Sequence, residues 1–218
     1  MRGAARIVVP IAMLVFAAVH AAAPPADLPT AVRGLQAWLD GTKTFEARFR
    51  QSLLSGALGA QTTETGRLYL ERPGKIRWDY LDPDRKIALL VGRSTELYLE
   101  DDRQLRRGVL SDEAGLFPKL LAGNGRLVEL FEATLVPPPQ EAPGDLALKL
   151  IPRGAAAAVS EVVLSLHRGD CAIAGAIVLD EMGNRTSYVF SQAKRNGKLP
   201  DGIFAFEPPP GTEIVADP

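Results

Sequence analysis

Residues 66–80 read GRLYLERPGKIRWDY, and this stretch predicts the fold of the chain. Apolar and polar side chains alternate on both sides of the turn-like tetrapeptide 72–75. A period of two is typical of β-strands, so the stretch predicts a β-hairpin with one apolar face. That face needs a partner, either the protein's own core or, more rarely, a small apolar ligand that the sheet encloses. The alternating apolar residues are Leu68, Leu70, Ile76, Trp78 and Tyr80.

The first residues have the features of an export signal. A cationic start with Arg2 and Arg6 precedes an apolar run over 7–19, and small residues follow at 21–23. Because the apolar run is short for a membrane span, we predict a signal peptide over residues 1–21 and one domain over 22–218. Its removal moves the formal net charge from −1 to −3, and a mildly acidic chain argues against nucleic acid as a partner.

The rest of the chain predicts a mainly antiparallel β structure. A helix with an apolar stripe is expected between Asp27 and Gly41, followed directly by a strand. Turn signals then recur about every ten residues, the spacing of one large antiparallel sheet. A second helical segment is expected over 112–121. It is either ordinary core or a movable cover, and its apolar patch consists of Leu116, Phe117, Leu120 and Leu121.

The sequence offers few residues for catalysis. His20 falls in the predicted signal peptide, which leaves His167, placed beside a turn, as the remaining imidazole. No nucleophile elbow, zinc-protease motif or phosphate-binding loop is present. We therefore predict no catalytic residues, no metal site and no cofactor. The one cysteine, Cys171, is expected to be a small buried residue of a strand, and no cysteine follows the cleavage site to carry a lipid anchor.

Basic residues gather around the opening hairpin. They form either a solvated outer face or a docking surface for an acidic partner. The residues are Arg67, Arg72, Lys75, Arg77, Arg85 and Lys86.

Several motifs, in order along nearly the whole mature chain, resemble the periplasmic outer-membrane lipoprotein carriers of the LolA family. The motifs are Gly66-x-Leu68-x-Leu70-x-Arg72-Pro73 followed by Trp78, then Gly92 with Gln104 beyond it, Asp180-x-x-Gly183-Asn184-x-Thr186 before Phe190, and Phe204-x-Phe206-x-Pro208-Pro209-x-Gly211.

This resemblance implies an α+β fold: an unclosed antiparallel β-barrel whose apolar concave face is covered by helices. It implies a monomeric, soluble periplasmic carrier that takes the acyl chains of lipoproteins from an inner-membrane ABC-type releasing complex and passes them to an outer-membrane acceptor lipoprotein. Two alternatives stay open, namely a related protein that carries another lipid or glycolipid, and a sensor or scaffold that uses the same fold without carrying lipid.

The resemblance also implies roles for individual residues. Arg72 is expected to latch a lid through hydrogen bonds to backbone carbonyls of the lid, and Ile76 is expected to meet the inner-membrane complex. The expected lid residues are Leu116, Phe117, Leu120 and Leu121. The expected cavity residues are Phe49, Leu68, Leu70, Trp78, Ile87, Leu89 and Leu97.

Overall fold

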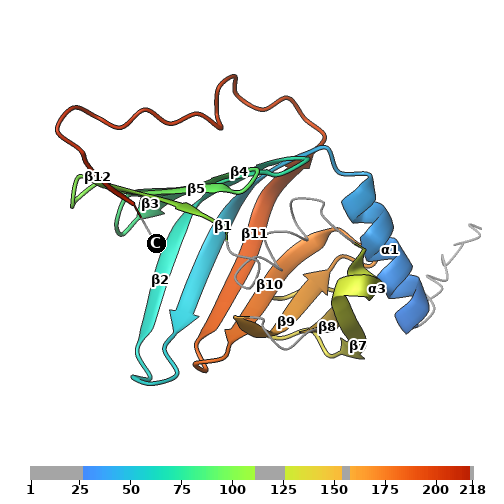
Figure 1. The fold of residues 1–218 in the computed structure, drawn as a ribbon. Coiled ribbons are helices and arrows are strands. Elements are labelled where there is room, and N and C mark those ends of the chain that lie inside the picture. The colour runs from blue at the N-terminus through green and yellow to red at the C-terminus, as the bar shows by residue number, and fades with distance from the viewer. Residues whose placement is uncertain (1–26, 111–125, 154–157, 217–218) are drawn as a thin grey trace, which may run out of the picture.

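The computed structural model of the protein describes residues 27–110, 126–153 and 158–216. These residues form one twelve-stranded sheet and two helices, α1 (Leu28–Asp40) and α3 (Leu127–Leu130) (Figure 1). The strands are β1 (Thr44–Leu54), β2 (Gln61–Glu71), β3 (Lys75–Asp82), β4 (Lys86–Val91), β5 (Ser94–Leu99), β6 (Gln104–Val109), β7 (Phe131–Val136), β8 (Leu146–Pro152), β9 (Val159–Leu166), β10 (Ile173–Asp180), β11 (Arg185–Arg195) and β12 (Glu213–Ala216).

The strand order is β12-β6-β5-β4-β3-β2-β1-β11-β10-β9-β8-β7. Neighbouring strands are antiparallel, except that β12 runs parallel to β6. In the described part of the chain, β12 and β7 end the sheet without pairing with each other, so the barrel is unclosed. This confirms the predicted fold class. The parallel pairing of the last strand was not predicted.

The stretch 66–80 forms the predicted hairpin. Its turn contains Gly74 at a φ of 73°, a backbone conformation that favours glycine. Trp78 lies opposite Leu68 and Ile76 lies opposite Leu70, so these four side chains share one face of the sheet. Because Leu68 and Leu70 are only 2% and 4% exposed, this face belongs to the interior.

Helix α1 covers that interior face. It begins at Asp27, whose side chain accepts a hydrogen bond from the backbone N–H of Thr30 at 2.9 Å, and it ends at Gly41, as the sequence predicts. The apolar stripe of α1 shares one core with both halves of the sheet. The backbone N–H of Leu127 in α3 donates to the side chain of Gln36 at 2.8 Å, and Figure 1 shows the two helices side by side.

Residues 197–212, which we call the C-terminal segment, run along the outer face of β3 to β5 before β12 joins the sheet (Figure 1). Phe206 packs against Tyr98 with ring centroids 4.9 Å apart. Arg77 donates to the carbonyl of Ile203 at 2.8 Å. The outer face of this part of the sheet is therefore covered by the C-terminal segment.

The prediction that Cys171 lies in a strand is wrong. The residue lies in the turn before β10 with a φ of 55°, half-buried beside Gly34 of α1. Burial raises the pKa of its thiol. The predicted signal peptide over 1–21 and the predicted helical segment over 112–121 lie outside the described residues.

Candidate functional site

Aromatic side chains line the concave face of the sheet, and α1 packs on one part of this face. Phe49 meets Trp78 edge to face with ring centroids 4.8 Å apart, and Tyr80 lies 5.1 Å from Phe49. On β11, Tyr188 and Phe190 lie 5.2 and 6.3 Å from Trp78. Edge-to-face and tilted contacts of this kind are the favourable geometries for aromatic pairs. They make one continuous apolar floor across β1, β3 and β11.

The C-terminal half of α1 packs closely on the part of the concave face that lies nearest the hairpin turn. The described residues leave an apolar cavity of about 20 Å³ between α1 and the floor, lined on the helix side by Trp38 and Leu39 and on the sheet side by Leu68, Leu70 and Phe190. That volume is on the order of what one water molecule requires. Between the C-terminal end of α1 and this part of the sheet, an acyl chain therefore fits only if α1 moves away.

Two arginines bind the C-terminal end of α1. The guanidinium of Arg72, in the turn of the hairpin, donates to the carbonyl of Leu39. Arg195, at the end of β11, donates to the carbonyl of Trp38 at 3.1 Å and to the hydroxyl of Thr42 at 2.8 Å. The last carbonyls of a helix lack partners within it and carry partial negative charge, so cations are favourable there.

The last turn of α1 contains no basic residue, so the arginines of β11 and of the hairpin turn supply these cations. Burial lowers the pKa of Arg72, and the charge of Asp40 opposes this shift. An arginine nevertheless stays protonated at any physiological pH, so the contact is not a pH switch.

Sequence reasoning missed Arg195. No motif surrounds it, and it is brought to α1 by the β1–β11 pairing, which joins residues about 150 positions apart. Its guanidinium also lies 5.6 Å from the ring of Trp38.

The concave face becomes polar at the end of β1 to β4. The hydroxyl of Tyr80 donates to Gln51 at 3.0 Å, Gln51 donates to Glu64 at 3.0 Å, and Lys86 forms an ion pair with the same carboxylate. Burial raises the pKa values of Tyr80 and Tyr188, with a smaller contribution from the charge of Glu64, so both phenols are neutral.

Five of the seven predicted cavity residues lie on the concave face. Phe49, Leu68 and Leu70 are buried there, and Trp78 and Leu97 are half-buried. The register places the other two, Ile87 and Leu89, on the outer face, because Ala88 between them pairs with both Trp78 and Leu97.

The prediction that Ile87 and Leu89 line the cavity is therefore wrong. Leu89 is instead buried on the side that the C-terminal segment covers, together with Tyr98.

The remaining predicted site residues have mixed positions. Ile76 is 3% exposed between Leu70 and Leu90, so a partner can reach its side chain only after the floor is uncovered. Arg72 bonds a backbone carbonyl of a covering helix, and that helix is α1. The predicted lid residues Leu116, Phe117, Leu120 and Leu121 lie outside the described residues.

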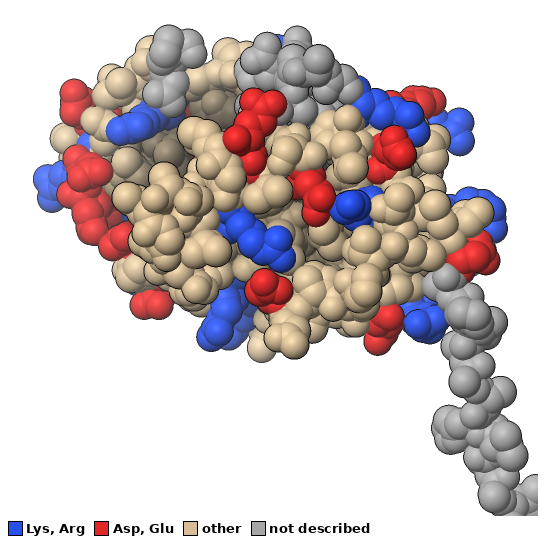
Figure 2. Space-filling model, turned by 90° about the horizontal axis from the view of Figure 1, so that it is seen from below, with Lys and Arg blue, Asp and Glu red and all other residues tan. Residues whose placement is uncertain are grey.

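The basic residues around the hairpin do not form one surface. Lys86 points to the concave face, Arg72 to α1, and Arg77 to Asp79 and the C-terminal segment. Figure 2 shows one face of the molecule on which charges of both signs are interspersed. His167 lies in an exposed turn, 3.8 Å from Asp145.

Neither described helix is long and apolar enough to cross a membrane. Within the described ranges, no group of three His, Cys, Asp or Glu side chains is arranged to hold a metal ion.

Comparison with known proteins gives a consistent result over most of the chain. Residues 40–207 match the family model described as "Outer membrane lipoprotein carrier protein LolA". The outer-membrane lipoprotein carrier protein of Chromobacterium violaceum is 31% identical over 94% of this chain and 96% of its own length. That of Azotobacter vinelandii is 30% identical over 94% and 98%. Among solved structures, an uncharacterized conserved protein from Thermus thermophilus superposes with a TM-score of 0.52 at 15% identity over 87% of this chain and 98% of its own, which is a likeness of fold.

Proposed function

This chain belongs to the LolA family of outer membrane lipoprotein carrier proteins, and we propose that it carries lipoproteins by burying their acyl chains on the concave face of its sheet. The observation that carries the proposal is the apolar concave face with its aromatic side chains, together with the close packing of α1 on the part of that face around Leu68, Leu70 and Phe190. The described structure is the closed state. Cargo binding replaces the apolar side chains of α1 with acyl chains.

The cost of exposing the apolar side chains of α1 and the gain from burying acyl chains are of comparable size. Moving α1 away exposes Leu35, Trp38 and Leu39, which are at most 6% exposed in the closed state. Their exposure costs roughly 5–9 kcal/mol at about 1.5–3 kcal/mol for each large side chain. A buried methylene returns about 0.8 kcal/mol, so roughly 6–11 methylenes offset the opening. One long acyl chain is sufficient, and additional chains supply the net affinity.

The arginine contacts set the bias toward closure. Arg72 and Arg195 stabilise α1 over the floor by bonding the carbonyls of Leu39 and Trp38. Cargo must compete with the closed state, so the free energy by which these contacts stabilise the closed state is subtracted from the free energy of cargo binding. A carrier needs this competition, because a cargo held too tightly cannot be passed on.

The biological setting follows from the family as a further part of the proposal. The mature chain, residues 22–218 after removal of the signal peptide 1–21, acts in the periplasm as one carrier domain without catalytic activity. It receives cargo from an inner-membrane ABC-type complex and delivers it to an outer-membrane acceptor lipoprotein.

A solubility assay tests the central claim. Delipidated protein is mixed with a triacylated lipoprotein, and the lipoprotein that stays in solution after centrifugation is measured. Leu97→Gln, on the concave face, should lower uptake, whereas Ile87→Gln, on the outer face of the next strand and equally half-buried, should not. Failure of the native chain to keep lipoprotein soluble would refute the lipoprotein cargo. If a hydrophobic fluorophore is still taken up, the cargo is another lipid.

A further inference from the structure

The outer face of the sheet has a groove of about 920 Å³, on the opposite side of β1 and β2 from the aromatic floor. Its floor is the outer face of β11, with Ser187, Val189 and Ser191. One wall is formed by β1 and β2. The other is the loop 137–145 between β7 and β8, represented by Gln140 and Glu141.

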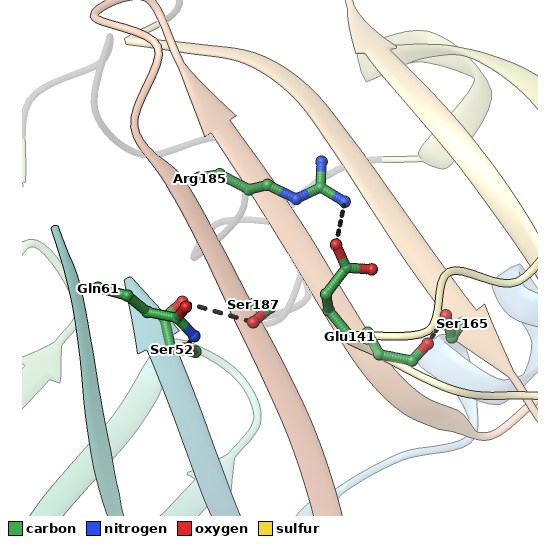
Figure 3. A network of polar contacts seen from close by, with 7 residues as sticks. Ser52, Gln61, Glu141, Ser165, Arg185 and Ser187 are labelled. Carbon is green, nitrogen blue, oxygen red and sulfur yellow. Dashed lines mark hydrogen bonds and ion pairs between the residues drawn. The ribbon is translucent and has the colours of Figure 1, made fainter. Parts of the chain in front are cut away.

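Two hydrogen bonds attach the loop wall to the sheet, one at Glu141 and one at Ala142. Arg185 of β11 donates to the carboxylate of Glu141 at 3.5 Å, and the hydroxyl of Ser165 in β9 donates to the carbonyl of Ala142. Ala142 is fully buried. Figure 3 shows these contacts, with Ser52 and Gln61 on the facing strands. The groove is therefore a walled channel and not a flat stretch of surface.

The β1–β2 wall carries an arrangement of charge that the fold itself does not require. Arg48 pairs directly with Arg67 across the two strands, and Arg50 follows two residues later on the same face. Like charges directly opposite each other in a sheet are destabilising. Tyr69 is the main hydrogen-bond partner of Arg67, and Glu46 and Asp79 attract it more weakly, although Asp79 also holds Arg77 at 2.6 Å.

Arg48 and Arg50 have no ion pair or side-chain hydrogen bond among the described residues. All three arginine side chains are exposed in the groove. An anion placed between them would replace the repulsion by charge-assisted hydrogen bonds, for which the guanidinium fork is well suited. The wall therefore has the side-chain chemistry of an anion-binding surface.

Uncharged hydrogen-bonding groups surround the arginines. Thr63 and Thr65 stand on β2, Ser191 on β11, and Gln61 and Gln140 on the two walls. Hydroxyls and amides both donate and accept, as the N–H and C=O groups of a peptide backbone require. A lipid bilayer cannot enter a walled groove, and the negative net charge of the chain disfavours nucleic acid.

We propose that this groove binds an acidic peptide segment in extended conformation, with two carboxylates on alternate residues contacting Arg48, Arg50 and Arg67. The spacing supports an extended chain, because Arg48 and Arg50 are two residues apart on one strand, or about 7 Å. Alternate side chains of an extended peptide have the same repeat and point to the same side. The site is separate from the concave face and does not depend on lipid binding.

Two capped octapeptides of identical composition test the spacing. In the first, Ser and Asp alternate, so acids stand at every second position. In the second, Ser-Ser-Asp-Asp is repeated, and no two acids are two positions apart. Binding of each fluorescently labelled peptide to the full mature chain is measured by anisotropy at low ionic strength, with inorganic phosphate as a competing single anion.

We expect the alternating peptide to bind about tenfold more tightly than the blocked one, the effect of one well-placed charge-assisted contact. The double variant Arg48→Gln with Arg50→Gln should lose this preference, and the double Lys variant should keep part of the affinity. Arg33→Gln on α1 removes the same charge from an exposed arginine elsewhere and should change nothing.

Three results would overturn the proposal. The first is equal binding of the two peptides, which would leave only general attraction between opposite charges. The second is an equal loss in Arg33→Gln. The third is displacement of the peptide by phosphate at equimolar concentration, which would show a site for a single small anion. Thermal unfolding of each variant checks that the sheet is intact.

Discussion

A disulfide between α1 and the sheet should trap the protein in its closed state. Gly34 of α1 faces the single cysteine of the chain, and a Cβ placed on Gly34 would lie 2.3 Å from Sγ and 3.3 Å from Cβ of Cys171. Disulfides need a Cβ–Cβ distance of about 3.5–4.5 Å. Gly34→Cys therefore needs a shift of a few tenths of an ångström and a rotation of the Cys171 thiol to form the bond.

The magnitude of the effect follows from the length of chain that the bond closes. About 137 residues separate the two positions, and closing such a loop removes denatured-state entropy worth about 5 kcal/mol. Within the folded state the bond acts on α1 directly. The helix can no longer leave the floor, so the exchange of apolar side chains for acyl chains is blocked without any change in the floor itself.

Uptake of a hydrophobic fluorophore and of lipoprotein should be measured for Gly34→Cys after oxidation and again after addition of a reductant. We expect at least a tenfold loss of uptake in the oxidised form and recovery in the reduced form. Gly34→Ser has nearly the same side-chain volume and cannot form the bond, so it separates the tether from the crowding that any Cβ causes at this position.

Normal uptake by the fully oxidised variant would refute the reasoning, because acyl chains would then enter without displacement of α1. Mass spectrometry of the oxidised Gly34→Cys protein must show the new cysteine linked to Cys171 for that result to count. A loss that the reductant does not reverse, and that Gly34→Ser shares, would instead show damage to the packing of the helix.

Three other predictions concern the contacts around α1 and the outer face. Arg72→Leu removes a charge-assisted hydrogen bond worth about 1.5 kcal/mol, so cargo should be taken up normally and released to an acceptor about tenfold more slowly. Arg195→Gln should act in the same direction. Unchanged transfer rates in these variants would argue against the latch. Leu68→Ala leaves a cavity in the floor and should lower the free energy of unfolding by about 2–5 kcal/mol in urea titrations, a value that a loss below about 1 kcal/mol would contradict. Phe206→Ala should lower stability by about 1–2 kcal/mol while leaving fluorophore uptake intact, since its contact with Tyr98 lies on the outer face; reduced uptake would show that the two faces are coupled.

Local patterns were sufficient for the opening hairpin and the first helix of this fold. The hairpin over 66–80 has a clear period of two and a turn marked by Gly74. The first helix has a clear apolar stripe, and its ends are marked by Asp27 and Gly41. The same reasoning failed for β4, whose sequence KIALLV is apolar at five successive positions. Such a run does not show which face is interior. The face of Leu89 was decided by the C-terminal segment, more than a hundred residues later in the chain.

Part of the concave-face site was also predictable from local sequence patterns. Phe49, Leu68, Leu70 and Trp78 alternate within strands whose register is set by neighbouring turns, so their shared face follows from the sequence. Arg195 has no such local signature, because its role depends on where β11 ends relative to α1. The groove was also missed, since Arg48 and Arg67 meet only through strand pairing and the opposite wall comes from a distant loop.

The pairing of β12 with β6 has a consequence for how the chain reaches this structure. Gln104 and Glu213 lie side by side although 109 positions separate them, and the intervening chain includes five of the twelve strands. Until the last residues are available, β6 presents an unpaired edge, the kind of surface on which other chains add strands. Contacts between such distant residues form late and slowly. Pairing of residues 213–216 with β6 thus protects this edge from other chains. Shortened chains that lack residues 213–216 should be the species most prone to associate through β6.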